Sequence, residues 1–233
     1  MGDSHLRLLG DMPMRTSRIS LVLIVALVAL VLASSAFATS VTMTYEGHQG
    51  ATAIDGSPFI GYPYYFSING SKTFTPLLCD SYDNSVSLGQ TFTATVSPFL
   101  QGISNSMFGA SMTLDYKAAG LIFKSMLAGG LDRAQAQWAI WGLFSTNAQS
   151  NPYFTTINGA AIDATYLAEA QTAGNGAYSG LLLYTPVGAK PGMGPQEFIG
   201  YSAVPEPASL TLLGTGLIGL AGMVRRKMAK VQD

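Results

Sequence analysis

The sequence predicts an α+β domain in which an antiparallel β-sheet, arranged as a sandwich or a barrel, carries an inserted helical segment. Two patterns support this prediction. Residues 41–45 and 91–96 alternate apolar and polar side chains, which is typical of strands with one buried face. Residues 113–128 place apolar side chains three and four positions apart, which is typical of a helix with one buried face. An apolar run near each end of the chain adds a signal peptide and a short C-terminal transmembrane helix to the expected organisation.

A β-hairpin is expected after the strand at 41–45. The runs Tyr64–Ile68 and Ser71–Thr75 are rich in β-forming residues and flank Asn69-Gly70. A two-residue hairpin turn needs positive φ at both central positions, which Asn and Gly tolerate best. The second arm of the hairpin leads directly into Leu78-Cys79-Asp80.

The second half of the sheet region is interrupted by helices. One face of the helix at 113–128 is expected to carry Leu114, Ala118, Leu121, Ile122, Ser125 and Met126. A second helix is expected from Asp132 to Phe144, because Asp132 as N-cap and Gln135 three residues later form a capping-box pattern. A third helix at 160–173 and closing strands at 181–184 and 197–201 complete the domain.

The first 38 residues have the features of a secretory signal peptide. Basic residues precede an apolar stretch at 19–32, and Ala36-Phe37-Ala38 supplies a small-residue cleavage site. The mature chain is therefore expected to start at Thr39. Two acidic residues are unusual in the basic region of a signal peptide, so translation from Met14 is an alternative; they are Asp3 and Asp11.

The C-terminal segment has three parts in a fixed order. Residues 204–209 read Val-Pro-Glu-Pro-Ala-Ser, residues 210–224 are apolar, and residues 225–230 are basic. Proline cannot continue a helix into the preceding chain, and a basic cluster stays on the cytoplasmic side of a membrane. Fifteen apolar residues span about 22 Å as a helix, less than the ~30 Å hydrocarbon core. The domain before this segment is therefore expected outside the cytoplasm.

These C-terminal residues resemble the PEP-CTERM sorting signal of Gram-negative bacteria that export proteins alongside an extracellular polysaccharide. The resemblance covers residues 203–230, with Pro205, Glu206 and Pro207 as the sorting motif and Arg225, Arg226 and Lys227 as the membrane-stop cluster. It implies an exosortase and the secretion machinery as partners. It also implies a location at the cell surface, in the outer envelope or outside the cell, with transient or permanent anchoring in the inner membrane. A plain tail anchor is the simpler alternative.

Residues 39–202 form the predicted ectodomain. They contain five basic and nine acidic residues, so the ectodomain is mildly acidic once both signals are set aside. Phosphate recognition requires clustered Lys and Arg, and the sequence therefore argues against a nucleic-acid partner. The low charge and the abundance of Gly, Ser, Thr and Tyr suit an extracellular β-rich protein better than a cytosolic enzyme.

Cys79 is the only cysteine of the chain, and an unpaired cysteine is unusual in an exported protein. Leu78-Cys79-Asp80 on a strand and Gln137-Trp138-Ala139-Ile140-Trp141 on a later helix together resemble the thioester domains of bacterial surface adhesins. That resemblance implies that Cys79 attacks the side-chain amide of Gln137, expels ammonia and forms an internal thioester. Trp138 and Trp141 would then shield the bond from water, and Trp141 lies one helical turn from Gln137.

The resulting hypothesis is a covalent adhesin whose target is a surface protein or an extracellular polysaccharide. It reacts once and is not an enzyme, and it requires no cofactor or metal. One alternative is a non-covalent structural component of the extracellular polysaccharide or biofilm in which Cys79 is simply buried. Another is a secreted hydrolase that pairs Cys79 with His48. Asp80, Asp83 and Asn84 offer oxygen atoms but lack the spacing of a calcium loop, and one Cys with one mature-chain His is too few for zinc.

Overall fold

The computed structural model describes residues 38–48, 52–54, 57–59 and 61–202. The predicted signal peptide and the sorting segment at 203–230, including its apolar run, lie outside these residues. Within the described part of the chain, no helix is long and apolar enough to cross a membrane.

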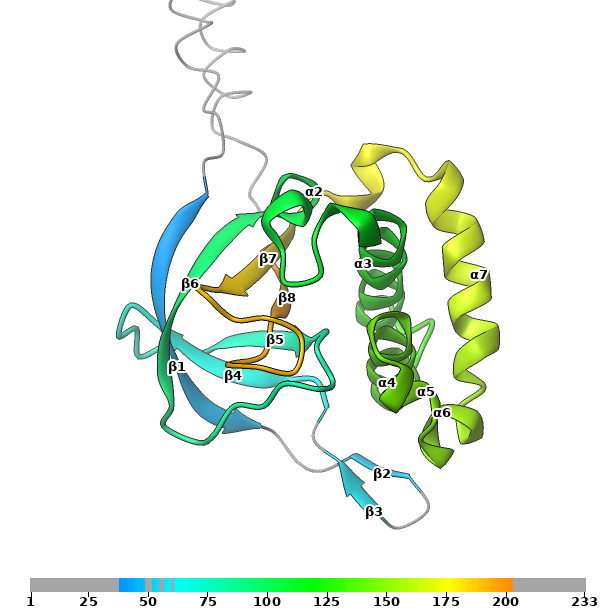
Figure 1. The fold of residues 1–233 in the computed structure, drawn as a ribbon, viewed down its shortest axis with the longest axis horizontal. Coiled ribbons are helices and arrows are strands. Elements are labelled where there is room, and N and C mark those ends of the chain that lie inside the picture. Colours follow the sequence, from blue (N-terminus) through cyan, green and yellow to red (C-terminus); the bar gives the residue numbers. More distant parts are fainter. Residues whose placement is uncertain (1–37, 49–51, 55–56, 60, 203–233) are drawn as a thin grey trace, which may run out of the picture. The chain divides into compact units, whose positions relative to one another are not determined.

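Six antiparallel strands close into a barrel in the order β1-β4-β5-β8-β7-β6 (Figure 1). Their bounds are β1 Thr39–His48, β4 Tyr64–Ile68, β5 Thr75–Cys79, β6 Thr91–Pro98, β7 Leu181–Pro186 and β8 Phe198–Tyr201. The strand β1 closes the barrel because it pairs with β4 on one edge and with β6 on the other, so that Met43 lies opposite both Ile68 and Phe92. The predicted α+β class is confirmed, and its sheet is a closed barrel.

Alternation along β1 explains why this strand can line a barrel. Val41, Met43 and Tyr45 are buried, whereas the intervening Thr42 is exposed. Side chains of successive strand residues point to opposite faces, so the three apolar residues fill the interior. The other interior positions come from every remaining strand of the barrel: Tyr64, Phe66, Leu77, Cys79, Ala94, Tyr184 and Phe198.

The predicted hairpin is correct in its turn and wrong in the start of its second arm. Asn69 and Gly70 both have positive φ, at 53° and 72°. The second strand, however, begins at Thr75 and not at Ser71, and its first pairing is Phe66 with Thr75. Ser71 forms side-chain hydrogen bonds with the backbone of Thr73 in both directions, at 3.1 Å each. Such local bonds offer the backbone an alternative to the ladder, which delays the strand.

The helices occupy the chain between β6 and β7 and pack beside the barrel (Figure 1). The long ones are α3 Thr113–Leu127, α4 Arg133–Phe144 and α7 Gly159–Thr172, and α3 packs against both of the others. The short elements are α2 Phe99–Gly102, η1 Ile103–Asn105, η2 Ala110–Met112, α5 Thr146–Gln149, α6 Pro152–Thr156 and η3 Asn175–Tyr178. A two-stranded sheet of β2 Thr52–Ile54 and β3 Ser57–Phe59 was not predicted.

The three predicted helices are confirmed, with one error in the buried face of α3. Ala118, Leu121, Ile122 and Met126 are buried as expected, but Leu114 is 36 % exposed. The first turn of α3 follows the 3-10 helix η2, none of whose residues is buried. Leu114 therefore lies beyond the packed surface, which begins at Tyr116.

The capping box predicted for α4 is present in full. The Gln135 N–H donates to Asp132 Oδ1 over 2.8 Å, and the Asp132 N–H donates to Gln135 Oε1 over 3.1 Å. The box satisfies two backbone donors at the start of the helix and fixes where α4 begins. It thereby sets which side chains of α4 face the barrel.

Two hydrophobic clusters meet at β5. Leu77 and Cys79 belong to the cluster inside the barrel, whereas Leu78 belongs to the cluster between the barrel and the helices. The inner cluster continues into Trp138 and Trp141 of α4. The end of β5 therefore lies where the barrel interior meets the helical layer.

Candidate functional site

The fold brings Cys79 and Gln137 into direct contact across 58 positions of sequence. Cys79 is the last residue of β5, and Gln137 lies in the second turn of α4. The Gln137 Nε2 donates a hydrogen bond to the backbone carbonyl of Cys79 over 2.6 Å. Both residues are fully buried. The predicted glutamine therefore contacts the predicted cysteine.

The other half of the Gln137 amide has no partner within the described residues. Its Oε1 is buried and accepts no hydrogen bond there. A buried carbonyl oxygen without a donor loses its hydration without compensation, which is costly. The side-chain carbonyl of Gln137 is therefore held in a dry position beside Cys79.

The thiol of Cys79 is held between one donor and one acceptor. The Trp141 Nε1–H donates to Sγ over 3.5 Å, and the thiol donates to the carbonyl of Ser81 over 3.6 Å. Trp141 lies one turn beyond Gln137 on α4, so the two side chains approach the same strand residue. Trp141, which was predicted to shield the Cys79–Gln137 bond, therefore contacts Cys79 directly.

Aromatic rings cover this end of the barrel. Trp138 and Trp141 meet edge to face with centroids 5.1 Å apart. Tyr82 lies against both rings, at 5.6 Å and 5.2 Å, and Tyr153 lies against Trp138 at 5.7 Å. The two tyrosines were not predicted as part of the site. Tyr82 could have been predicted as part of the site because it lies three residues after Cys79 in the sequence. Tyr153 lies in α6, and its sequence position does not indicate that it is near Cys79.

The environment keeps the thiol protonated. Burial, and secondarily the nearby Asp80, raise the pKa of Cys79 to about 12, against the smaller opposing effect of the Trp141 hydrogen bond. A nucleophilic cysteine of a hydrolase requires the opposite shift. The exposed His48 instead shares a hydrogen bond of 3.2 Å with the Tyr45 hydroxyl through Nδ1. This geometry disfavours the hydrolase alternative.

A pair of buried acids lies next to the thiol, and sequence reasoning missed it. Glu197 accepts hydrogen bonds from the Tyr116 and Thr185 hydroxyls and from the Met107 N–H, the last over 2.9 Å. Asp80 is fully buried, and neither of its carboxyl oxygens has a donor among the described residues. Burial, and then the charge of Glu197, raise the pKa of Asp80 well above its ordinary value.

The two acidic side chains can form a hydrogen bond with each other only if one of them is protonated. Burial also raises the pKa of Glu197, although its hydrogen bonds oppose that shift. A neutral Asp80 can donate to Glu197, whereas two neighbouring buried carboxylates would repel each other. We conclude that Asp80 is the protonated partner. The only sequence signal was an acidic residue directly before an apolar strand, at Glu197.

The remaining polar candidates have separate structural roles. Asn84 donates to the carbonyls of Lys190 and Gly194, at 2.9 Å and 3.1 Å, and accepts from the Gly192 N–H at 2.9 Å. Asp83 accepts from the Asn147 amide at 2.8 Å. Among the described residues, no group of three His, Cys, Asp or Glu side chains is placed to hold a metal ion.

Comparison with known proteins identifies the C-terminal segment. The PEP-CTERM protein-sorting motif matches residues 203–227. This motif indicates an exported protein that is processed by an exosortase and is associated with the membrane or the cell surface. The residues predicted as the motif, Pro205 to Pro207, and the basic cluster from Arg225 fall within the match. No curated protein and no solved structure gives a significant match to the chain.

Proposed function

We propose that the ectodomain is an adhesin that binds its target covalently through an internal thioester between Cys79 Sγ and the side-chain carbonyl carbon of Gln137. The observation that carries the proposal is the buried hydrogen bond of 2.6 Å from Gln137 Nε2 to the backbone carbonyl of Cys79, which holds the glutamine side chain beside the residue that carries the thiol. Reacting groups held together in a fixed orientation gain a large advantage over groups that must meet by diffusion.

The bond-forming step balances without a cofactor. Sγ attacks the Gln137 side-chain carbonyl carbon, the carbon–nitrogen bond breaks, and the amide nitrogen leaves as ammonia with the thiol proton. The carbonyl oxygen of the product is the present Oε1 of Gln137. Because burial raises the pKa of the thiol to about 12, transfer of the proton to the nitrogen as the new bond forms is favoured over ionisation of the thiol beforehand.

The aromatic rings beside Cys79 would protect the thioester from water until a target reacts with it. A thioester is lost to hydrolysis when water reaches its carbonyl, and Trp138 and Trp141 are only 2 % and 6 % exposed. Opening requires a nucleophile on the target, such as a lysine amine or a carbohydrate hydroxyl. That nucleophile would join the Gln137 carbonyl and release the Cys79 thiol. The protein would act once and would not turn over, so it is not an enzyme in this scheme.

Sorting by an exosortase is consistent with this role, because an adhesin must act outside the cell. The intact mass of the exported full-length chain, purified in detergent, tests the proposal. The wild type should be lighter than its sequence by one ammonia. Cys79→Ala and Gln137→Ala should each lose this deficit. Methylamine should convert the wild type to a form heavier by one methylamine, with one free thiol.

Gln101→Ala serves as the matched control, because Gln101 is exposed and lies outside the site. It should keep the deficit. All variants are produced and purified by the same procedure, so processing at the N-terminus or the C-terminus affects them equally. If the wild type and the two site variants all have the masses of their sequences, the thioester is absent. The protein would then be a non-covalent component of the extracellular matrix, with Cys79 as a core residue.

A further inference from the structure

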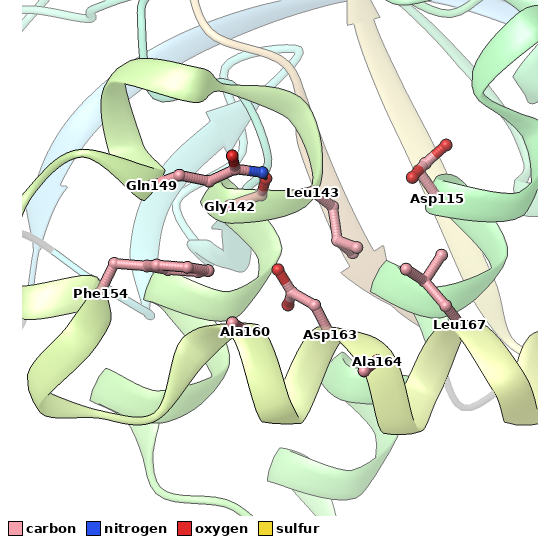
Figure 2. A pocket seen from close by; sticks show the side chains of 9 residues that line it. All are labelled: Asp115, Gly142, Leu143, Gln149, Phe154, Ala160, Asp163, Ala164 and Leu167. Atoms are coloured by element: carbon pink, nitrogen blue, oxygen red, sulfur yellow. The ribbon is translucent and has the colours of Figure 1, made fainter.

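A second site lies away from Cys79, between α4 and α7. A cavity of about 330 Å³ opens there, within the range of small-ligand pockets. Its walls are mostly apolar, with Leu143, Phe154 and Leu167 among them (Figure 2). Two acidic side chains also line it, Asp163 from α7 and Asp115 from α3.

Asp163 occupies a position where a helix normally carries an apolar residue. The buried stripe of α7 runs through Gly159, Asp163 and Ala170, at helical spacing. Asp163 is only 7 % exposed. A buried aspartate lowers stability unless its carboxyl group is protonated or has a charged or hydrogen-bonding partner. This mismatch between residue type and helical position is also the sequence signal for the site.

The carboxyl of Asp163 points into the cavity and lacks a partner. Figure 2 shows it rising from α7 toward the α4 backbone, between Phe154 and Leu167. Its buried Oδ1 accepts no hydrogen bond from the described residues. Two glycines leave space for the Phe154 ring that lines the cavity, since a Cβ at Gly142 or Gly159 would lie within 2.3 Å of that ring.

We propose that this cavity binds a primary ammonium group carried on an aliphatic chain, with Asp163 as its counter-ion. An ammonium has three donors and no acceptor, which matches a carboxylate without donors and a second carboxylate, Asp115, across the cavity. The methylene groups of the ligand would lie against Leu143, Phe154 and Leu167. A lysine side chain and a free alkyl amine share this chemistry.

Binding should depend on pH in a defined direction. Burial, with a smaller effect of Asp115, raises the pKa of Asp163 to about 8. The empty site is therefore protonated at neutral pH, and an ammonium must displace that proton. Affinity should rise about tenfold per pH unit below the pKa and level off above it. Asp115 is the other titratable group lining the cavity; the lining from α4, α5 and α6 is uncharged.

Calorimetric titration with n-butylammonium tests the proposal. All proteins are full-length chains in detergent that carry Cys79→Ala, so that an amine cannot react with a thioester and the outcome does not depend on the proposed function. The starting protein should bind the probe saturably at pH 8. Asp163→Asn should weaken binding about tenfold or more, as expected for loss of a charged hydrogen-bond partner. An alkylammonium stays charged throughout, since its pKa resembles that of lysine, about 10.4.

Three comparisons make the result specific. Glu169→Gln removes the same charge from an exposed position of α7 and should leave binding unchanged. Ala164→Leu keeps Asp163 but narrows the cavity from the exposed side of α7, and it should weaken binding. The uncharged analogue n-butanol should bind far more weakly. Equal affinity for butanol, or equal binding by Asp163→Asn in a protein with wild-type circular dichroism, overturns the proposal.

Discussion

The indole Nε1–H of Trp141 donates a hydrogen bond to the Sγ of Cys79 over 3.5 Å, which ties α4 to the end of β5. Both groups are buried, so the bond does not compete with water. Trp141→Phe keeps most of the ring and removes the donor. We expect the free energy of unfolding to fall by about 1 kcal/mol.

A double-mutant cycle isolates this contact from the packing of the ring. Cys79→Ala and Trp141→Phe are measured singly and together by urea denaturation. Residues in contact typically show coupling of about 0.5 kcal/mol or more. Strictly additive effects would show that the indole contributes through packing alone.

The contacts of Trp141 illustrate what the sequence could predict. The capping box at Asp132 and the 3.6-residue periodicity locate α4, and from these follow the faces of Gln137 and Trp141. The strand pattern around Cys79 locates β5. Local rules therefore predicted the two elements, and the motif pair predicted that they meet.

Contacts between residues that lie far apart in the sequence could not be predicted from such local rules. Glu197 contacts Met107, which lies 90 positions away in the sequence, and Thr185 of β7, and no local pattern predicts these contacts. The same holds for barrel closure, because the pairing of β1 with both β4 and β6 depends on the summed twist of the whole sheet. The late start of β5 was missed because the side chain of Ser71 competes locally for the backbone.

The capping box gives a prediction about helix α4. Asp132→Ala removes the acceptor of the Gln135 N–H and should lower the free energy of unfolding by about 1 kcal/mol. The neighbouring Arg133→Ala should change it little, because Arg133 is exposed and Ala suits a first helical turn. Thermal unfolding of the two variants and the wild type makes the comparison. Equal stability of Asp132→Ala and the wild type would contradict it.

Asn84 gives a prediction about the loop at 187–195. Its side chain bonds four backbone groups of this loop while being almost fully buried. Asn84→Ala removes these hydrogen bonds and should lower the free energy of unfolding by about 2 kcal/mol. We expect a protease of broad specificity to cut the loop near the exposed Met193 several-fold faster, with the cut located by mass.

Asn147→Ala is the matched control for this loop. This variant also loses a side-chain hydrogen bond, the one from Asn147 to Asp83, but Asn147 is exposed. Exposed groups regain water, so the cost should be small. If both variants are cut at the same rate within 187–195, Asn84 does not hold the loop.

The acid pair of Asp80 and Glu197 predicts an unusual pH dependence of stability. The folded pKa of Asp80 lies above its unfolded value of about 3.9, so the folded state keeps a proton that the unfolded state loses. The contribution of this proton to the free energy of unfolding is complete below about pH 4 and is lost as the pH rises toward the pKa of Asp80 in the folded protein. The raised pKa values of Glu197 and Asp163 act in the same direction. Stability should therefore fall from pH 4 to pH 7, by up to about 1.4 kcal/mol per pH unit for each proton.

The Asp80→Asn variant tests how much of this change in the free energy of unfolding with pH, the slope measured below, comes from the pair of Asp80 and Glu197. An asparagine amide can donate to Glu197 without a titratable proton, so the variant should lose less stability than the wild type between pH 4 and pH 7. Urea midpoints at four pH values measure the slope. Asp163→Asn should flatten the slope separately, and the double variant should combine both effects, because the two sites share no hydrogen-bond partner among the described residues. A slope in Asp80→Asn equal to that of the wild type would mean that Asp80 is ionised in the folded protein. The proton would then reside on Glu197, and Glu197→Gln would be the variant that flattens the curve.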